Sequence, residues 1–218
     1  ADWRGLHIFA GSQALDADAI IETQAATVGL AADLAEAVCV PPPLVNLGGG
    51  FGIPYFSGDT ALDIAKVGEA LKETLSRRHA ILGQSAFAVE LGRWLVGEAG
   101  VYLTRIVDRK VSHGQIFLVT DGGLHHQLAA SGNFGTVVRR NYPVAVANRF
   151  GAEMEEEASV VGCLCTPLDR LADQVGLPRA EAGDIVALFM AGAYGASASP
   201  AGFLGHPPGL KMLGDVPR

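Results

Sequence analysis

Three short polar segments follow strand-like apolar segments in the first ninety residues, and their residue types suit the binding of an anion. They are Gly11-Ser12-Gln13 after GLHIFA, Gly48-Gly49-Gly50 after LVNL, and Glu90-Leu91-Gly92-Arg93 after AFAV. Glycines let backbone N–H groups approach a phosphate closely, and a serine hydroxyl and an arginine add donors. Each segment alone is also typical of an ordinary turn or a surface ion pair. Their recurrence indicates an anion site, because ligands of α/β folds bind at the carboxyl ends of strands.

Reactive side chains also occur in three segments of the second half of the chain. GCLCTPLD contains Cys163 and Cys165, VTDGGLHH contains Asp121, His125 and His126, and AGAYG contains Tyr194. Strand alternation predicts that the two cysteines share one face, where both can also be interpreted as small buried hydrophobes. For VTDGGLHH we expect a turn with solvated histidines. For Tyr194 we expect a strand end, with small neighbours that leave its hydroxyl accessible.

The segments that must position these groups alternate between strand-like and helical patterns up to about residue 95. The strand-like runs GLHIFAG, LVNL and AFAV are separated by two segments rich in helix formers, residues 15–38 and 60–78. In the second of these, apolar residues recur on one helical face: Ile64, Val67, Leu71 and Leu75. The order strand, helix, strand, helix, strand predicts a parallel α/β arrangement.

The pattern changes after about residue 100 and becomes mostly β-like. VYLTRIVDRK and QIFLVTDGG are rich in valine and isoleucine, and EAGDIVALFMAGAYG is typical of a turn followed by a buried strand. PLDRLADQVG is the one segment here that we predict as a short helix. We place a domain boundary near residues 95 to 100, and expect domains of residues 1–97 and 98–218.

Composition excludes several classes of protein. The chain has 218 residues, is 49% hydrophobic and carries a formal net charge of -7, which argues against nucleic-acid binding. No apolar run reaches the ~20 residues of a membrane helix, and the first residues do not resemble a signal peptide. The three cysteines, Cys39, Cys163 and Cys165, are too few for a disulfide framework or a complete zinc site. We therefore expect a cytoplasmic, reduced protein without a metal site.

Taken in order, six segments resemble the fold-type III pyridoxal-phosphate (PLP) decarboxylases, the family of ornithine, arginine and diaminopimelate decarboxylases. They are GLHIFAGSQ, VNLGGGFG, ELGRWLVGEAGVYLTRIVDRK, VTDGG, GCLCTPLD and GDIVALFMAGAYG. The segments span nearly the whole chain. The resemblance implies an α/β plus β fold, in which the later strands of an alanine-racemase-like TIM barrel precede a C-terminal β-domain. It also implies a homodimer whose active sites are shared between subunits.

The resemblance gives the matching residues of the first half a role in binding PLP. Ser12 and Gly50 would bind the phosphate, while Gly48 and Gly49 would shape the turn. Glu90 would pair with the pyridine nitrogen. A carboxylate at this position keeps the nitrogen protonated, so that the ring accepts electrons when the α-carboxylate leaves as carbon dioxide.

The remaining roles involve the substrate and the second half of the chain. Arg93 would serve the phosphate or the substrate carboxylate, and Tyr194 would contact the phosphate. Cys165 would protonate the carbanionic carbon from the partner subunit. Asp121 and Thr166 would lie near the substrate. The resemblance leaves His7 as a structural strand residue.

The chain departs from the family pattern at several positions. None of its lysines, Lys66, Lys72, Lys110 and Lys211, lies in the family's Schiff-base motif, so we expect a fragment that is inactive alone. Phe9 replaces the histidine that stacks on the PLP ring; it can still stack but cannot titrate. Thr166 and Ala129 replace the charged residues that hold basic substrates or diaminopimelate. Leu91 replaces a proline.

These departures favour a different substrate. HIFAGSQ and CTPLD resemble decarboxylases found with exosortase systems and decarboxylases that act on an amino acid tethered to an acyl carrier protein. A basic pair, Arg139 and Arg140, offers a dock for an acidic carrier, although a solvated pair explains it more simply. Two other functions stay open. One is an amino-acid racemase, which Glu90 disfavours, and the other is a non-catalytic phosphate-binding module.

Overall fold

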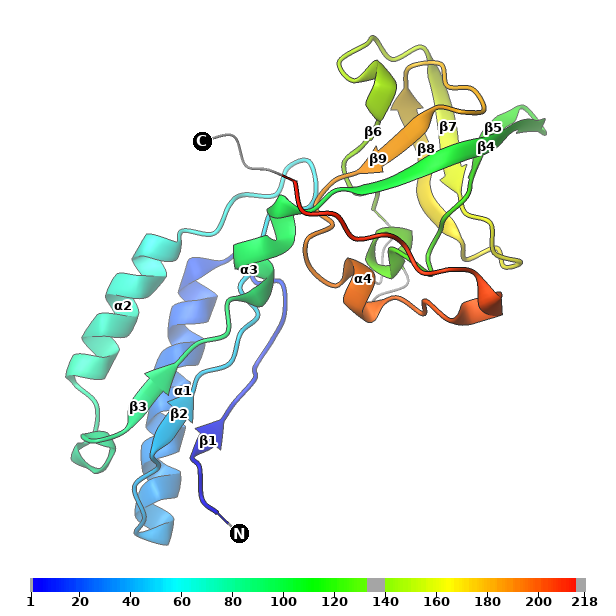
Figure 1. Cartoon of the computed structure of the whole chain (residues 1–218). Helices are drawn as coiled ribbons and strands as arrows, with labels where there is room; N and C mark the ends of the chain where they lie inside the picture. Colours follow the sequence, from blue (N-terminus) through cyan, green and yellow to red (C-terminus); the bar gives the residue numbers. More distant parts are fainter. Residues whose placement is uncertain (1, 133–139, 215–218) are drawn as a thin grey trace. The chain divides into compact units, whose positions relative to one another are not determined.

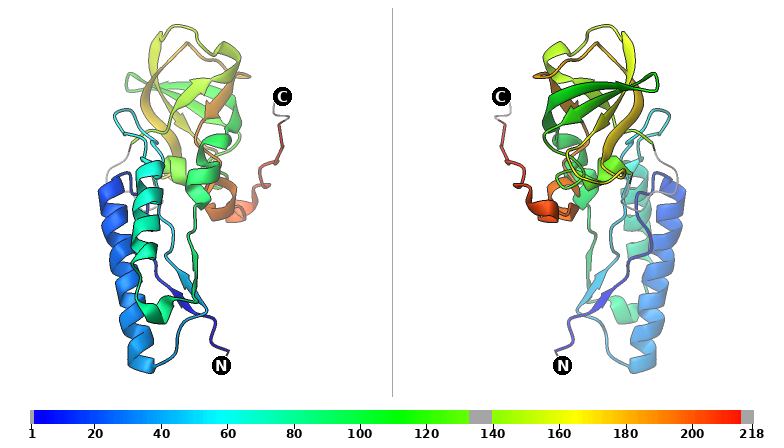
Figure 2. Two further views of the ribbon diagram at one scale, coloured as in Figure 1. Left: turned by 90° about the vertical axis from the view of Figure 1, so that its left-hand side faces the viewer. Right: turned by 90° about the vertical axis from the view of Figure 1, so that its right-hand side faces the viewer.

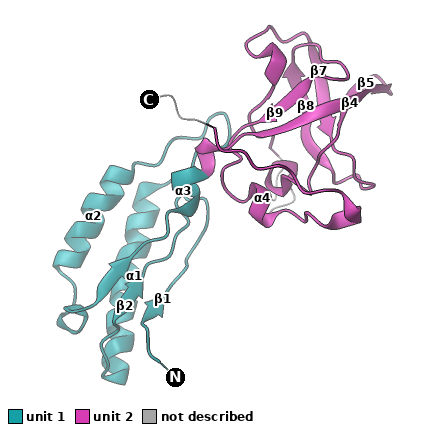
Figure 3. Ribbon diagram, in the orientation of Figure 1, with its two compact units in different colours: residues 1–96 teal, residues 97–218 magenta. Residues whose placement is uncertain are grey.

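The computed structural model describes residues 2–132 and 140–214. The chain divides into two compact units, Ala1–Val96 and Gly97–Arg218 (Figure 3). Each unit has its own sheet and its own hydrophobic core. Within the described ranges, no helix is long and apolar enough to span a bilayer.

The first unit is a parallel three-stranded sheet in the order β1-β2-β3, as predicted. Its strands are β1 (Leu6–His7), β2 (Leu44–Asn46) and β3 (Ala86–Ala88). Its helices are α1 (Ala17–Val38), α2 (Ile64–Ser76), the short η1 (Ala80–Leu82) and α3 (Gly92–Val96). The two long helices cover one face of the sheet (Figures 1 and 2).

Local sequence explains the two long helices. The Asp16 side chain caps α1 by accepting the backbone N–H groups of the first turn, and Asp63 caps α2 in the same way. Helix α1 ends at Cys39, whose backbone is left-handed. One apolar stripe of α1, which includes Ala31 and Ala35, packs against Val45 at the centre of the sheet.

The second unit is a six-stranded sheet in the order β6-β9-β4-β5-β7-β8 (Figure 1). Its strands are β4 (Tyr102–Ser112), β5 (Gln115–Thr120), β6 (Val144–Val146), β7 (Glu156–Val161), β8 (Arg170–Leu177) and β9 (Ile185–Leu188). The unit also contains short helices before, between and after these strands: η2 (Gly97–Ala99), η3 (Leu128–Ser131), η4 (Ala147–Arg149), α4 (Gly195–Ala198) and η5 (Phe203–Gly205). Its core includes Ile106, Leu118, Leu171 and Leu188, each contributing about 1.5–3 kcal/mol of stability by burial.

The prediction of a helix in PLDRLADQVG is wrong, because this segment forms β8, antiparallel to β7. The pairing with β7 contains register shifts, and Gln174 has a positive φ of 46°. Its N–H donates to the Ser159 hydroxyl at 3.0 Å. Such an irregularity interrupts the alternation of buried and exposed residues by which a strand is recognised. Strand pairing and the burial of Leu171 outweigh the helix propensity of the segment.

Candidate functional site

The three polar segments of the first unit lie side by side at the edge of the parallel sheet where the C-terminal ends of its strands meet. The Glu90 N–H donates to the Gly48 carbonyl at 2.9 Å, and the Ala14 N–H donates to the Gly50 carbonyl at 2.8 Å. These bonds join the segment after β2 to the segments after β3 and β1. The sequence pattern therefore identified groups that share one edge.

The glycine turn after β2 allows the segments to approach one another this closely. Gly48 and Gly50 have φ values of 73° and 90°, which disfavour other residues. A Cβ on Gly50 would collide with the Gly11 carbonyl, and a Cβ on Gly49 would collide with the Glu90 carbonyl. Backbone groups of the turn thus form a narrow edge that only glycine permits.

Arg93, in the short helix α3, extends towards the segment after β1. Its guanidinium donates to Gln13 Oε1 at 3.2 Å and to Ser12 Oγ at 3.5 Å. The same guanidinium lies 5.4 Å from the centre of the Tyr55 ring, a cation–π contact. Gln13 is itself fixed by two hydrogen bonds to the Ile53 backbone. A serine hydroxyl and a guanidinium therefore lie together beside the glycine turn.

Two side chains from neighbouring strands hold the carboxylate of Glu90. Asn46 Nδ2 donates to Glu90 Oε1 at 2.8 Å, and His7 Nε2 lies 3.4 Å from the same oxygen. Asn46 also accepts the Gly48 N–H at 2.9 Å. Glu90 is about half exposed, so its carboxylate is oriented but still accessible.

Phe9 and Tyr194 belong to different units. Phe9 follows β1, and 60% of its surface is exposed at the same sheet edge as Glu90. Tyr194 lies in the second unit, directly before α4, and 42% of its surface is exposed. Its φ of 59° is unusual for a tyrosine and turns the chain from β9 into α4.

The two cysteines of GCLCTPLD lie in the loop between β7 and β8, so the prediction that they lie on a strand and share one of its faces is wrong. Cys165 is exposed and Cys163 is half-buried. Thr166, also half-buried, accepts the Leu168 N–H at its hydroxyl. The loop therefore presents a thiol and a neutral hydroxyl in adjacent positions.

Hydrogen bonds to the side chain of Asp169 hold this loop in place. Its buried carboxylate accepts the N–H of Leu164 at 2.8 Å and the N–H of Leu124 at 2.6 Å. A Cβ on Gly123 or Gly162 would collide with that carboxylate, which explains both glycines. Asp169 thus joins the cysteine loop to the turn after β5.

Asp121 begins the turn after β5 and has an exposed side chain. Its Oδ1 accepts the Thr104 hydroxyl at 2.8 Å and the Arg105 N–H at 2.9 Å. Its backbone carbonyl lies 3.6 Å from the sulfur of Cys163. The carboxylate therefore fixes the turn to β4, and the turn contacts the cysteine loop.

The prediction of solvated histidines in this turn is wrong. His125 is 1% exposed, and neither of its ring nitrogens has a partner among the described residues. Burial lowers the pKa of His125 below its usual value, and the neighbouring His126 and His206 rings lower it further. His125 is therefore a neutral buried imidazole at pH 7.

His126 makes two hydrogen bonds that fix its tautomer. Nε2 lies 2.8 Å from the Pro207 carbonyl, which can only accept, so Nε2 carries the proton. Nδ1 then accepts the Tyr102 hydroxyl at 3.0 Å. Burial raises the pKa of Tyr102 far above its usual value, so the phenol stays protonated and can donate.

Several residues of this geometry were not identified from the sequence. Asn46 and Asp169 each orient a candidate site residue or its loop, and His206 joins the cysteine loop from the C-terminal segment. A polar residue at the end of an apolar strand, such as Asn46 in LVNL, is a signal that could have been used. No local pattern points to His206.

Comparison with known proteins identifies clear relatives. The family described as pyridoxal-dependent decarboxylase, C-terminal sheet domain, matches residues 14–192. The L-glutamyl-[BtrI acyl-carrier protein] decarboxylase of Niallia circulans is 40% identical over 213 residues, 96% of this chain and 50% of that protein. The diaminopimelate decarboxylase of Archaeoglobus fulgidus is 35% identical over 193 residues, 88% of this chain and 44% of that protein. The chain thus spans about half the length of the curated relatives it matches.

Solved structures align with most of the chain. Diaminopimelate decarboxylase from Helicobacter pylori complexed with L-lysine aligns with a TM-score of 0.72 at 25% identity, over 88% of this chain and 45% of that chain. Lysine/ornithine decarboxylase from Vibrio vulnificus complexed with putrescine aligns with a TM-score of 0.75 at 22% identity, over 94% of this chain and 53% of that chain. The second likeness shows the fold alone.

Proposed function

The chain belongs to the pyridoxal-dependent decarboxylase family, and on that premise we propose that the full-length protein decarboxylates an amino acid or an amino-acid derivative with PLP. The observation that supports this most directly is the carboxyl edge of the parallel sheet. There a glycine turn, a hydroxyl, a guanidinium and an oriented carboxylate lie together.

The residues at this edge fit the cofactor. Phosphate needs several closely placed donors, and the narrow glycine turn with Ser12 and Arg93 provides them. We assign phosphate binding to Ser12, Arg93 and Gly50, with Gly48 and Gly49 setting the turn. The family resemblance adds Tyr194 of the second unit to this set.

Glu90 is proposed to hold a proton on the pyridine nitrogen. Asn46 and His7 orient its carboxylate, which supports a directional hydrogen bond to the ring. Phe9, exposed at the same edge, supplies an aromatic face for stacking. When bound, PLP stabilises the electron pair that the departing carbon dioxide leaves on the α-carbon.

Cys165 is proposed to protonate that carbon after carbon dioxide has left. Its thiol is exposed on a loop that Asp169 fixes to the turn after β5. We place Asp121 and Thr166 near the substrate, since both border this loop. Proton transfer from a positioned side chain typically contributes about 10²–10⁴-fold to a rate.

Two neutral residues, Thr166 and Ala129, support a substrate without a basic end group. Thr166 and Ala129 stand where the family resemblance expects charged clamps. A relative 40% identical is named for a glutamyl group on an acyl carrier protein. We therefore propose an aminoacyl group tethered to a carrier as the substrate class. Arg140 is exposed and could meet an acidic carrier, while Arg139 lies outside the described residues.

The test uses full-length protein, with the change Glu90→Gln. We expect wild type to bind PLP and to release carbon dioxide from an aminoacyl carrier faster than from the free amino acid. We expect Glu90→Gln to retain PLP but to lose about 10²-fold or more in kcat, because the proton on the ring nitrogen is no longer held. Carbon dioxide release is followed with carboxyl-labelled substrate.

The control is His79→Gln, a change at an exposed histidine of the first unit that pairs with Glu36. It should leave PLP binding and kcat unchanged. Full-length wild type that never binds PLP would contradict the proposal. Inversion of the amino acid without loss of carbon dioxide, measured by chiral chromatography, would replace decarboxylation with racemisation.

A further inference from the structure

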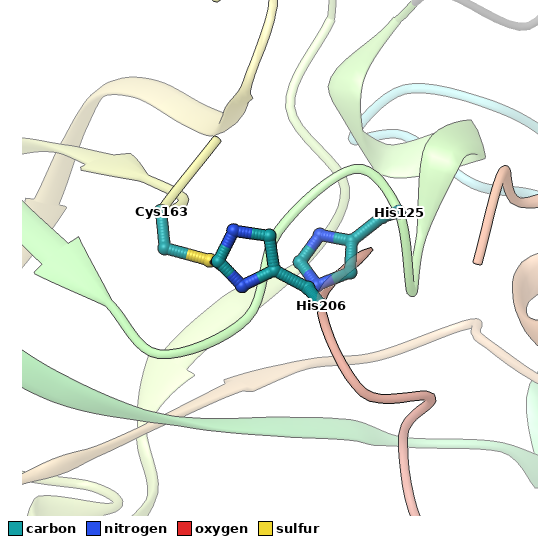
Figure 4. A group of neighbouring side chains, drawn as sticks. All are labelled: His125, Cys163 and His206. Atoms are coloured by element: carbon teal, nitrogen blue, oxygen red, sulfur yellow. The ribbon is translucent and has the colours of Figure 1, made fainter. Parts of the chain in front are cut away.

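The second unit contains a cluster of metal-binding side chains that the proposed reaction does not use. His125 Nδ1 or Nε2, the Cys163 sulfur and a ring nitrogen of His206 all lie within 4.8 Å of one another (Figure 4). They come from the turn after β5, the loop after β7 and the C-terminal segment. We propose that His125, Cys163 and His206 bind a zinc ion.

The spacing of these atoms supports a tetrahedral ion. Zinc bonds of about 2.0 Å to nitrogen and 2.3 Å to sulfur place two nitrogens roughly 3.3 Å apart and a nitrogen and a sulfur roughly 3.5 Å apart. Cys163 Sγ and His206 Nδ1 are 3.8 Å apart. The three ligand atoms lie within 4.8 Å of one another, so the proposal requires the side chains to move slightly closer together when the ion binds.

The buried imidazole of His125 is the independent observation that points to a ligand. It is 1% exposed, and both ring nitrogens are unpaired among the residues that the structure describes. Buried polar groups in folded proteins almost always have a partner. A metal ion held with Cys163 and His206 would provide one.

The donor set and the charges around it favour zinc over a hard cation. Two imidazoles and a thiolate suit zinc, whereas calcium and magnesium prefer oxygen ligands. Metal binding replaces the proton of the Cys163 thiol, which is released to solvent. The buried carboxylate of Asp169 lies close enough to interact with His125 and Cys163, and it offsets part of the added positive charge.

The site would join the C-terminal segment to the loop that carries Cys165. Three protein ligands leave a fourth position for water or a small anion. A hydrogen bond from His126 to the Pro207 carbonyl already fixes the same segment next to His206. The proposal is independent of the decarboxylase reaction, because none of the three ligands is assigned a role in it.

The test measures zinc retained by tag-free full-length protein after zinc addition and gel filtration, using inductively coupled plasma mass spectrometry. We expect one zinc per chain in wild type and loss of that zinc in Cys163→Ser. Cys165→Ser, the same change two residues away, should retain zinc. His206→Asn should lose it, while His113→Asn, in the exposed turn between β4 and β5, should not.

Cobalt gives a second readout. Cobalt-loaded wild type and Cys165→Ser should show thiolate-to-cobalt charge-transfer absorbance, and Cys163→Ser should lack it. Circular dichroism checks that each variant is folded. If Cys163→Ser does not fold, the zinc content of His206→Asn tests the site instead. Wild type that retains no more zinc than Cys163→Ser or His206→Asn overturns the site. PLP content of the same samples separates this outcome from failure of the proposed function, since Cys163→Ser should keep PLP.

Discussion

The chemistry of the first unit depends on residues that orient other residues. Glu90 can meet a ring nitrogen only when its side chain points in the right direction. Asn46 and His7 both contact its Oε1 and so restrict the direction of the carboxylate. Gln13 does the same for Arg93 through its bonds to the Ile53 backbone. These supporting contacts are direct, but each joins segments that are distant in sequence.

At the residue scale, Cys165→Ala tests the proposed proton donor. We expect full-length Cys165→Ala to lose about 10²-fold or more in kcat, since a positioned acid has been removed. In deuterated water, the wild-type product should carry deuterium in one configuration at the α-carbon, and the variant product should carry it in both. Nuclear magnetic resonance of the derivatised product measures this ratio.

The matched control for this prediction is Cys39→Ala, which changes an exposed cysteine at the end of α1. It should have the wild-type rate and stereochemistry. If Cys165→Ala also keeps both, another group protonates the product.

At the scale of elements, the turn before β9 shows how the second unit is held together. Strand β9 is preceded by a turn in which the largely buried Asp184 accepts three hydrogen bonds. The donors are the Glu181 N–H, Asn148 Nδ2 and Arg149 Nε. They hold the pKa of Asp184 below its usual value, with the Glu181 N–H contributing most. Asp184 thus stabilises the folded form as an anion.

This predicts a pH-dependent effect of Asp184→Asn. A carboxyl group whose pKa is lowered by folding stabilises the protein above its unfolded pKa of about 3.9, and the effect is lost as pH falls through the lowered value. At pH 7 we expect Asp184→Asn to lower stability by about 1–3 kcal/mol, because a charged acceptor is lost. The difference in Tm from wild type should shrink as the pH falls below about 4.

Thermal melts of full-length protein, followed by circular dichroism between neutral and acidic pH, measure this difference. Asp33→Asn, at an exposed position of α1, is the control and should match wild type throughout. A Tm difference for Asp184→Asn that stays constant with pH would contradict the role of its charge.

At the scale of the whole molecule, the family resemblance implies a dimer in which Cys165 serves the partner's cofactor site. This predicts complementation between two inactive full-length variants, Glu90→Gln and Cys165→Ala. In a mixed dimer, one of the two shared sites has both residues intact. Each mixed dimer should therefore have about half of wild-type activity, and an unseparated random mixture, in which half of the dimers are mixed, about a quarter, as expected for a two-fold symmetric dimer.

Co-expression with two different tags yields the mixed dimers, and light scattering gives their mass. The two variants mixed without subunit exchange are the control and should stay inactive. Mixed dimers that are no more active than either parent would show that each subunit completes its own site.

Much of the fold follows from the sequence. Helix caps at Asp16 and Asp63, the apolar faces of α1 and α2, and the glycine turn are local features, so they could be predicted. The family, the PLP cofactor class and the later barrel strands followed by a β-domain were also predicted and are confirmed. The motifs that identify the family consist of short runs of adjacent residues, so they can be recognised in the sequence alone.

The sequence alone therefore determined the strand-end groups around Ser12, Gly50 and Glu90, because parallel strands bring their carboxyl ends to one edge. Only the tertiary structure decided that the segment from Arg170 to Leu177 is a strand, since its irregular pairing with β7 hides the alternation. Only the tertiary structure decided that His125 is buried and meets Cys163 and His206. Contacts between three separate loops depend on chain packing, and no local periodicity encodes them.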